Sequence, residues 1–192
     1  MIAIIDYGAG NLFSVKNALD YIGEAYTITK DIGEIRRADS FILPGVGAFP
    51  YAMRMLHATG LVDELKKQAQ LKPFLGICLG MQMLFEESDE FELTSGLGLI
   101  PGRISKLPEM GLKIPHMGWN NLHLHQPDNV FLAGLREDDC VYFVHSFAAN
   151  TEEPYIAASC EYGRTVPALV VNGTTYGAQF HPEKSGEVGL QM

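Results

Sequence analysis

Cys78 lies in a segment whose residue types and spacing are typical of a catalytic nucleophile. In Gly76-Ile77-Cys78-Leu79-Gly80 a glycine stands two residues before and two residues after the cysteine, between an apolar run that predicts a strand and a run that predicts a helix. This is the pattern of a nucleophile elbow, a sharp turn whose strained backbone leaves no room for flanking side chains. The helix dipole at such a turn favours a thiolate. The alternative, a small buried cysteine in a strand, leaves both glycines unexplained.

A catalytic thiolate needs a base, and His181 is the best placed of the six histidines. It directly follows a segment, 175–180, that predicts a strand, and Pro182 biases its backbone toward an extended conformation. Glu183 can hold the imidazole in one orientation and one tautomer. Cys78, His181 and Glu183 therefore supply the nucleophile, the base and the orienting carboxylate of a triad, which is defined by these roles.

Two backbone segments can stabilise the charge that develops on a carbonyl attacked by a thiolate. In an elbow, one donor is the N–H group after the nucleophile, here that of Leu79. The other donor comes from an earlier strand-to-helix loop, and residues 44–47, Pro-Gly-Val-Gly, occupy that place. An ordinary glycine-rich turn has the same composition, so the residues alone leave both interpretations open.

The first half of the chain alternates between strand and helix patterns, as expected of elements that position such groups. Strands are predicted at 2–5, 26–29, 41–43 and 73–77, and helices at 12–22, 48–57 and 61–70. After residue 95 the chain predicts closely spaced strands at 97–106, 112–124, 139–148 and 155–162, then a hairpin of 168–171 and 174–180 turning at Asn172-Gly173. The expected fold class is α/β, with a mostly parallel central sheet, flanking helices and a later antiparallel extension.

Length and composition favour one globular domain over residues 1–192. The chain is 47% hydrophobic, which suffices for one core, and it contains no repeat or linker. A net charge of −9 argues against nucleic acid as a partner. Three widely spaced cysteines favour a reducing cytoplasm over disulfides. No signal-peptide pattern and no apolar run near the roughly 20 residues of a membrane span is present, so we expect a soluble, cytoplasmic protein without a membrane partner.

Two further motifs are weak indications of a cofactor or a metal. Gly8-Ala9-Gly10 follows a strand, but Phe13 stands where a dinucleotide-binding fingerprint has glycine. His123 and His125 would share one face of a strand, yet no third ligand stands at a plausible spacing, which favours a surface pair. No cofactor and no metal is expected.

The catalytic segments resemble those of the class I glutamine amidotransferases. The family pattern is carried by Gly76-x-Cys78-x-Gly80-x-Gln82 together with His181-Pro182-Glu183. More narrowly, the chain resembles the glutaminase subunits of imidazole glycerol phosphate synthase, from residue 2 to about residue 189. Four segments carry this narrower match: 6–11 (DYGAGN), 44–49 (PGVGAF), 116–120 (HMGWN) and 142–146 (YFVHS).

The resemblance implies a flavodoxin-like fold and a glutaminase that acts through the triad. It assigns the oxyanion donors to the N–H groups of Val46 and Leu79. It also implies that the released ammonia passes to a barrel-fold cyclase subunit in a heterodimer, which makes imidazole glycerol phosphate and an aminoimidazole carboxamide ribonucleotide in histidine biosynthesis. The substrate-binding residues it implies are Gly45, Gly47, Gln82, Ser146 and Phe147, where Phe147 replaces a common tyrosine, and the residues of the docking face are Trp119, Tyr142 and Lys184. His145 is predicted to be packed or hydrogen-bonded near the site.

Two alternatives remain open. The same glutaminase can serve another synthase, such as one making purines, pyridoxal phosphate or an amidino-sugar, or the elbow can belong to a non-enzymatic or peptidase-like relative. Co-purification with the cyclase distinguishes the first alternative, and hydrolysis of free glutamine distinguishes the second. The chain ends at Met192, nine residues beyond Glu183, whereas the family usually continues into a terminal helix; the sequence leaves open whether the protein is longer.

Overall fold

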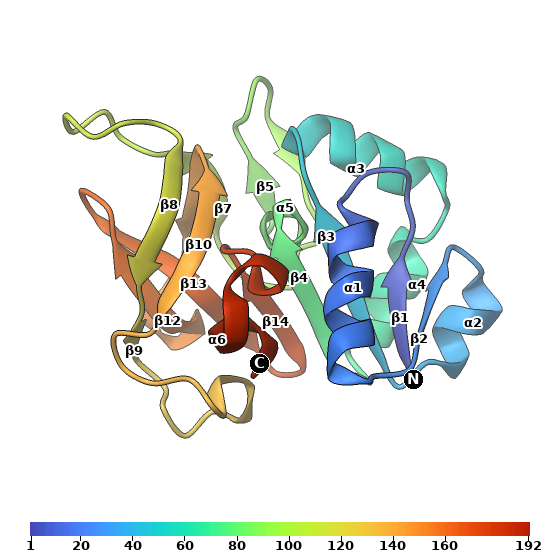
Figure 1. The fold of residues 1–192 in the computed structure, drawn as a ribbon. Coiled ribbons are helices and arrows are strands. Elements are labelled where there is room, and N and C mark those ends of the chain that lie inside the picture. Colours follow the sequence, from blue (N-terminus) through green and yellow to red (C-terminus); the bar gives the residue numbers. More distant parts are fainter.

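An eight-stranded sheet organises the computed structural model, which describes all 192 residues (Figure 1). The strand order is β2-β1-β3-β4-β14-β13-β12-β9. The strands are β1 (Ile2–Ile5), β2 (Tyr26–Thr29), β3 (Ser40–Gly45), β4 (Phe74–Cys78), β9 (His123–Leu124), β12 (Ile156–Glu161), β13 (Thr165–Asn172) and β14 (Thr175–Ala178). The first five strands in this order pair in parallel, and β13, β12 and β9 continue the sheet with antiparallel pairs. The predicted fold class is confirmed.

Helices cover both faces of the parallel half because its strands are apolar on both faces. They are α1 (Leu12–Ile22), α2 (Ile32–Arg37), α3 (Phe49–Ala58) and α4 (Val62–Ala69). Successive strand residues point to opposite faces. Accordingly, Ile4 packs in a cluster with Val15 of α1, whereas Ile5 lies in the large cluster with Met53 of α3 and Leu65 of α4. The helices predicted at 12–22, 48–57 and 61–70 are thus confirmed, and each of their ends lies within one residue of the predicted end.

The short helix α2 was missed by the sequence analysis. It has six residues, of which only Ile35 is buried, so no apolar period develops. Its start is defined by Asp31, whose carboxylate accepts a hydrogen bond from the Glu34 N–H group at 2.8 Å. The sequence signals for this helix are confined to its ends: the capping carboxylate of Asp31, Glu34 in the first turn, and Arg36 and Arg37 in the last turn.

The prediction that all later strands extend the main sheet was wrong in part. β8 (His116–Asn121) and β10 (Cys140–His145) form a separate antiparallel pair. β5 (Glu87–Ser88), β6 (Thr94–Ser95), β7 (Arg103–Lys106) and β11 (Phe147–Asn150) form a third sheet. The predicted strand 139–148 therefore divides at Ser146, and 112–124 divides into β8 and β9, because the two parts of each segment pair with different sheets. Of the predicted strand 97–106, only the last four residues are a strand.

The hairpin near the C-terminus is confirmed, one residue out of register at its turn. β13 and β14 pair from Leu169–Ala178 to Asn172–Thr175, so Gly173 and Thr174 form the two-residue loop. Gly173 has φ +59°, a conformation that favours glycine.

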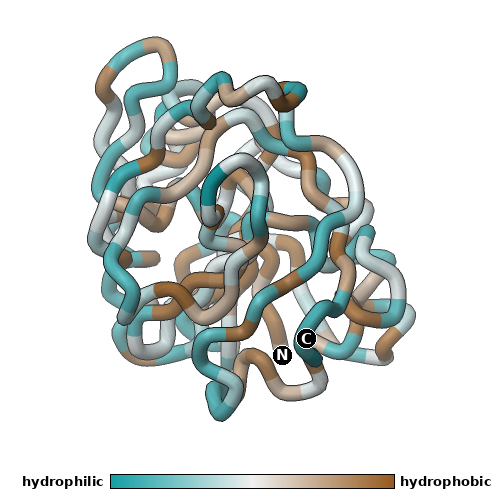
Figure 2. The backbone as a smooth tube through the Cα atoms, turned by 90° about the vertical axis from the view of Figure 1, so that its left-hand side faces the viewer, coloured by the Kyte–Doolittle hydropathy of each residue, from teal (hydrophilic) through white to brown (hydrophobic).

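The remaining elements follow or connect the sheets. The chain closes with a 3₁₀ turn, η3 (Pro182–Lys184), and α6 (Gly186–Leu190), and two further 3₁₀ turns are η1 (Val130–Leu132) and η2 (Glu153–Tyr155). Hydrophobic segments run through the middle of the molecule and hydrophilic ones lie mainly at its outer loops (Figure 2). The helices are all too short or too polar to cross a lipid bilayer.

Candidate active site

The structure places Cys78 on a strained turn between β4 and α5 (Leu79–Gln82). Its backbone has φ 55° and ψ −111°, a left-handed conformation that costs a non-glycine residue energy and that characterises nucleophile elbows. A Cβ atom on Gly76 would lie 2.6 Å from the Gly80 carbonyl oxygen, and one on Gly80 would lie 1.8 Å from the Leu43 carbonyl oxygen. Both glycines are therefore required because β3, β4 and α5 approach one another closely here.

We expect Gly80→Ala to lower the free energy of unfolding by about 3 kcal/mol or more, because its methyl group would collide with the backbone of β3. Gly23→Ala is the matched control. Gly23 ends α1 with φ +78° and has no atom within 4 Å of an added Cβ, so this change is expected to cost only about 1 kcal/mol. Urea unfolding curves of the two variants measure the difference, and equal losses would contradict the packing argument.

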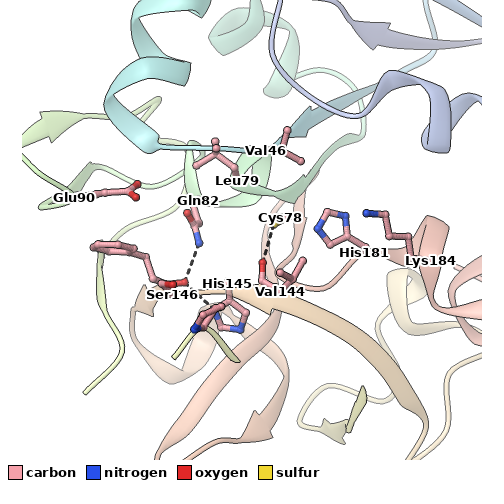
Figure 3. Close-up of a pocket in the computed structure, with 13 residues that line it drawn as sticks. Val46, Cys78, Leu79, Gln82, Glu90, Val144, His145, Ser146, His181 and Lys184 are labelled. Carbon is pink, nitrogen blue, oxygen red and sulfur yellow. Dashed lines mark hydrogen bonds between the residues drawn. The ribbon is translucent and has the colours of Figure 1, made fainter. Parts of the chain in front are cut away.

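The imidazole of His181 lies against the carboxylate of Glu183, with Nδ1 2.8 Å from Oε1. The two side chains are only 3% and 4% exposed. Burial alone would lower the pKa of His181, but hydrogen bonds to Cys78 and Glu183 and the charges of these groups outweigh burial and raise the pKa to about 9. Since Glu183 binds Nδ1, the Nε2 atom is the ring nitrogen left to face Cys78, whose thiol donates to the Val144 carbonyl at 3.9 Å in this structure (Figure 3).

The backbone of His181 is held in place by β10. Its N–H group donates to the carbonyl of Tyr142 at 3.0 Å, and the Tyr142 N–H group donates to Ser185 Oγ at 3.0 Å. The Ser185 hydroxyl in turn donates to the His181 carbonyl at 2.7 Å. These hydrogen bonds fix the backbone of His181 relative to β10.

The two segments predicted to form an oxyanion hole lie on either side of the thiol. Gly45 is the register partner of Cys78 in the parallel β3–β4 pair, and its Cα approaches the elbow so closely that an added Cβ would lie 2.5 Å from the Gly80 nitrogen. Leu79 is the first residue of α5, so its N–H group has no acceptor within the helix. Val46 is 43% exposed at the rim. These positions agree with the predicted donors, whose role stays a prediction.

A pocket of about 420 Å³ opens beside Cys78, within the range of ~300–1,000 Å³ usual for small-molecule sites (Figure 3). It is lined by most of the residues that the sequence analysis selected: Val46, Gly47, Cys78, Leu79, Gln82, Ser146, Phe147, His181 and Lys184, with Glu90, Pro115, Val144 and His145. Gly45, Trp119, Tyr142 and Glu183 are not part of this lining.

Gln82 is buried at the pocket wall and its orientation is fixed. Its Nε2 donates to the Phe147 carbonyl at 2.9 Å and to Gln179 Oε1 at 3.1 Å. The carbonyl oxygen of the Gln82 amide is therefore the atom that remains for a ligand. Phe147 contributes its main chain here, while its side chain packs against the core.

Glu90 is a pocket residue that the sequence analysis missed. Its Oε2 accepts a hydrogen bond from the Phe49 N–H group at the start of α3, at 2.7 Å. Burial raises the pKa of this carboxyl, and the bond from Phe49 partly opposes that effect. Glu90 follows Glu87 and Asp89 in an acidic stretch, so nothing in the local pattern distinguished it.

Trp119, Tyr142 and Lys184, predicted to lie on a docking face, are close to the catalytic base. Trp119 is 57% exposed, and its ring packs edge-on against Tyr142 with 6.0 Å between ring centroids. Lys184 is exposed and lines the pocket beside His181 (Figure 3). Trp119 and Tyr142 are thus in contact with each other, and Lys184 lies in the pocket lining with His181.

His123 and His125, predicted to be a surface pair and not a metal site, each bind a different partner. His123 Nδ1 lies 3.0 Å from Glu137 Oε1, whereas His125 Nε2 lies 2.7 Å from Ser159 Oγ. Ligand atoms of His123, Glu137 and Asp138 lie within 4.8 Å of one another. Since Glu137 already binds His123 and the Leu124 N–H group, an exposed hydrogen-bonded cluster accounts for this grouping.

The elbow, the histidine–carboxylate pair and the pocket beside them have the geometry of a thiol-dependent acyl-transfer site on an α/β fold. A family model described as glutamine amidotransferase class-I matches residues 3–191, and the chain belongs to this family. A structure described as a crystal structure of glutamine amidotransferase has a TM-score of 0.77 at 19% identity, over 99% of this chain and 95% of that one. PurLQS from Thermotoga maritima has a TM-score of 0.75 at 21% identity, over 99% and 93%. These two likenesses confirm the fold.

Within the class, the curated relatives are more specific. A protein of Bacillus cereus (strain ATCC 14579) named imidazole glycerol phosphate synthase subunit HisH is 52% identical over all of this chain and 91% of its own length. A protein of the same name from Exiguobacterium sibiricum is 50% identical over 100% and 92%. The narrower resemblance found in the sequence, to the glutaminase subunits of imidazole glycerol phosphate synthase, is thereby confirmed.

Proposed function

We propose that this chain is the glutaminase subunit of an imidazole glycerol phosphate synthase, hydrolysing glutamine to glutamate and ammonia for a cyclase subunit in histidine biosynthesis. The observation that carries the proposal is the meeting of Cys78 with His181, whose Nδ1 is bound to Glu183, at a pocket walled by Gln82 and Glu90. The names of relatives about half identical over the whole chain support the choice of synthase. We infer also that residues 1–192 form one domain, because the main sheet contains strands from both ends of the chain.

The triad performs two successive acyl transfers. Cys78 Sγ attacks the side-chain amide carbon of glutamine, a C–S bond forms, and the carbonyl electrons move to oxygen, where the N–H groups of Leu79 and Val46 stabilise them. His181, charged by the thiol proton, protonates the amide nitrogen as the C–N bond breaks and ammonia leaves. His181 then takes a proton from water, which attacks the thioester carbon; the C–S bond breaks, His181 returns the proton to Cys78 Sγ, and glutamate leaves. Glu183 orients the imidazole and stabilises its charge.

The pocket offers groups that suit the amino-acid end of glutamine. Glu90 supplies a carboxylate at the wall, and its unshared oxygen can bind the substrate's ammonium group. The free carbonyl oxygen of Gln82 can accept a second hydrogen bond from the same group. The main chain at Ser146 and Phe147 closes the pocket on that side. Glutamine recognition therefore combines a charge with fixed dipoles.

A glutaminase that released ammonia without an acceptor would waste glutamine, so we propose that activity requires the cyclase subunit, a barrel-fold partner in a heterodimer. Docking over Trp119, Tyr142 and Lys184 can reach His181 through β10, because the Tyr142 carbonyl binds the His181 N–H group. Docking can also favour the orientation of the Gly45–Val46 peptide that presents its N–H group to the oxyanion. Shifting such a two-state peptide from mostly the inactive orientation to mostly the active one requires a free-energy difference of about 5 kcal/mol. An interface can supply a difference of this size.

The expected result is low glutaminase activity for the isolated chain and strong stimulation by the cyclase with its nucleotide ligand. We expect Lys184→Ala to reduce the ratio of stimulated to basal activity about tenfold, as loss of one interface contact would. Lys67→Ala, on the exposed side of α4, is the control and should leave the ratio unchanged. Glutamate release assays of the chain with and without the cyclase measure both. Full activity in the isolated monomer would refute partner control, and absence of glutamine hydrolysis in the complex would refute the proposed function.

A further inference from the structure

Two buried histidines outside the triad, His116 and His145, are hydrogen-bonded to each other. The His116 Nδ1 and His145 Nε2 atoms are 3.0 Å apart, and the residues are 2% and 6% exposed. His116 lies on β8 and is stacked between the rings of Phe143 and Tyr162, with centroid distances of 4.7 and 3.9 Å. Hydrogen bonds and stacking together fix the position of this pair.

The direction of every hydrogen bond in this cluster follows from the Phe147 carbonyl, the acceptor at one end of the series. The Phe147 carbonyl can only accept, so His145 Nδ1, 2.8 Å away, carries a proton. His145 Nε2 then accepts from His116 Nδ1, and His116 Nε2 accepts from the amide of Asn120 at 3.3 Å. The same Asn120 nitrogen donates to the Glu161 carbonyl at 2.9 Å. Both histidines are therefore neutral Nδ1–H tautomers, because a second proton on His145 would place two donors face to face.

Burial supports the neutral state of both rings. Desolvation lowers the pKa of His116 to about 4. Desolvation likewise lowers the pKa of His145 to about 3, against the opposing bond to the Phe147 carbonyl. The charges of His116, Arg164 and His181 lower the pKa of His145 further. The chain of hydrogen bonds is consequently intact throughout the neutral pH range.

The series of hydrogen bonds ends on the Phe147 carbonyl oxygen, which also orients Gln82 at the pocket wall. The Phe147 carbonyl accepts from His145 and, at 2.9 Å, from Gln82 Nε2. Two donors of fixed direction thus hold one carbonyl, and this carbonyl selects which end of the Gln82 amide faces the pocket. Without the His145 bond, the Phe147 carbonyl at the turn between β10 and β11 keeps only one side-chain bond, from Gln82 itself.

We propose that His145, supported by His116 and Asn120, is a positioning residue for substrate binding: it fixes the Phe147 carbonyl and, through it, the orientation of Gln82 in the pocket. The inference rests on the proposed glutaminase function, because it assigns Gln82 to the glutamine. His145 takes no part in proton transfer, so its removal should affect the binding of glutamine and leave the reaction of the thiol itself unchanged.

The test compares variants in the complex with the cyclase subunit. His145→Leu is expected to raise KM for glutamine about tenfold with kcat within about threefold, since a binding contact and not a reacting group is lost. His145→Asn, whose amide can replace Nδ1, should restore most of the affinity. His116→Phe keeps the stacking and should raise KM less. His125→Leu, which removes a histidine hydrogen bond outside the pocket, should leave both constants unchanged.

Two further measurements make the test independent of folding and of the proposed function. The rate of Cys78 alkylation by iodoacetamide should be unaltered in His145→Leu. Histidine ¹⁵N NMR of the unaltered chain should show both His116 and His145 as neutral Nδ1–H tautomers at pH 7. An Nε2–H tautomer at either position, or an unchanged KM in His145→Leu, would overturn the proposal. If the unaltered complex released no glutamate, the glutaminase function would fail while the tautomers remained measurable.

Discussion

Replacing Cys78 by alanine or serine is expected to abolish glutamine-dependent synthesis in the complex, by about 10⁴-fold or more, as loss of a covalent nucleophile does. Synthesis from added ammonium salt should stay within about twofold of the unaltered complex, because ammonia bypasses the step that the thiol performs. The reason is geometric: the elbow places the Cys78 thiol, the nucleophile of the proposed reaction, in the pocket with His181. Parallel assays with glutamine and with ammonium chloride measure the two activities.

The control for this experiment is Cys140→Ala, which removes a partly buried thiol on β10 that is not part of the pocket. It should retain both activities. If a well-folded, partner-bound Cys78→Ala lost ammonia-dependent synthesis as well, the division of labour between glutaminase and cyclase would be wrong.

His181→Ala is expected to lower kcat for glutamine about 10⁴-fold. The loss of kcat in Glu183→Gln should be smaller than the loss in His181→Ala by a factor of about 10 to 100. In the proposed mechanism His181 transfers protons in both half-reactions, whereas Glu183 only orients and stabilises it. The amide that Glu183→Gln introduces can still accept a hydrogen bond from His181 Nδ1 but carries no charge. Because hydrogen bonding to Cys78 and Glu183 raises the pKa of His181 to about 9, Glu183→Gln should also lower that pKa.

Rate measurements across pH in the presence of the cyclase, together with an NMR titration of His181, give both quantities. The exposed pair of His123 with Glu137 provides the control, since Glu137→Gln alters a similar contact far from the pocket and should leave kcat unchanged. A Glu183→Gln loss as large as that of His181→Ala would show that the carboxylate takes a direct part in proton transfer.

The local parts of the site were predictable because each is encoded by neighbouring residues. The two glycines around Cys78 are needed by a turn only five residues long, and their close contacts in the structure give the reason. His181 and Glu183 are two residues apart and meet at 2.8 Å. The hairpin of β13 and β14 is equally local, so its prediction failed by only one residue at the loop.

The parts that failed depend on contacts distant in sequence. Ser146 divides a continuous apolar segment because its two halves pair with β8 and β7, which no local pattern reveals. Glu90 enters the pocket through a hydrogen bond to Phe49, 41 residues earlier in the chain. α2 is short, and its helical state depends on packing of one side chain, Ile35, against the core.

The sequence by itself determined the chemistry: a thiol nucleophile, its base and carboxylate, and the parallel sheet whose strand ends carry them. These features depend on short-range backbone geometry and on the alternation of apolar residues, and both are encoded by residues close to one another in the sequence. Only the tertiary structure decided the arrangement of the pocket that we propose holds the substrate. The orientation of Gln82, the carboxylate of Glu90 and the hydrogen-bonded pair of His116 and His145 join segments 29 to 65 residues apart. Hydrogen-bond direction and burial arise only when such segments meet, so no pattern along the chain could have specified them.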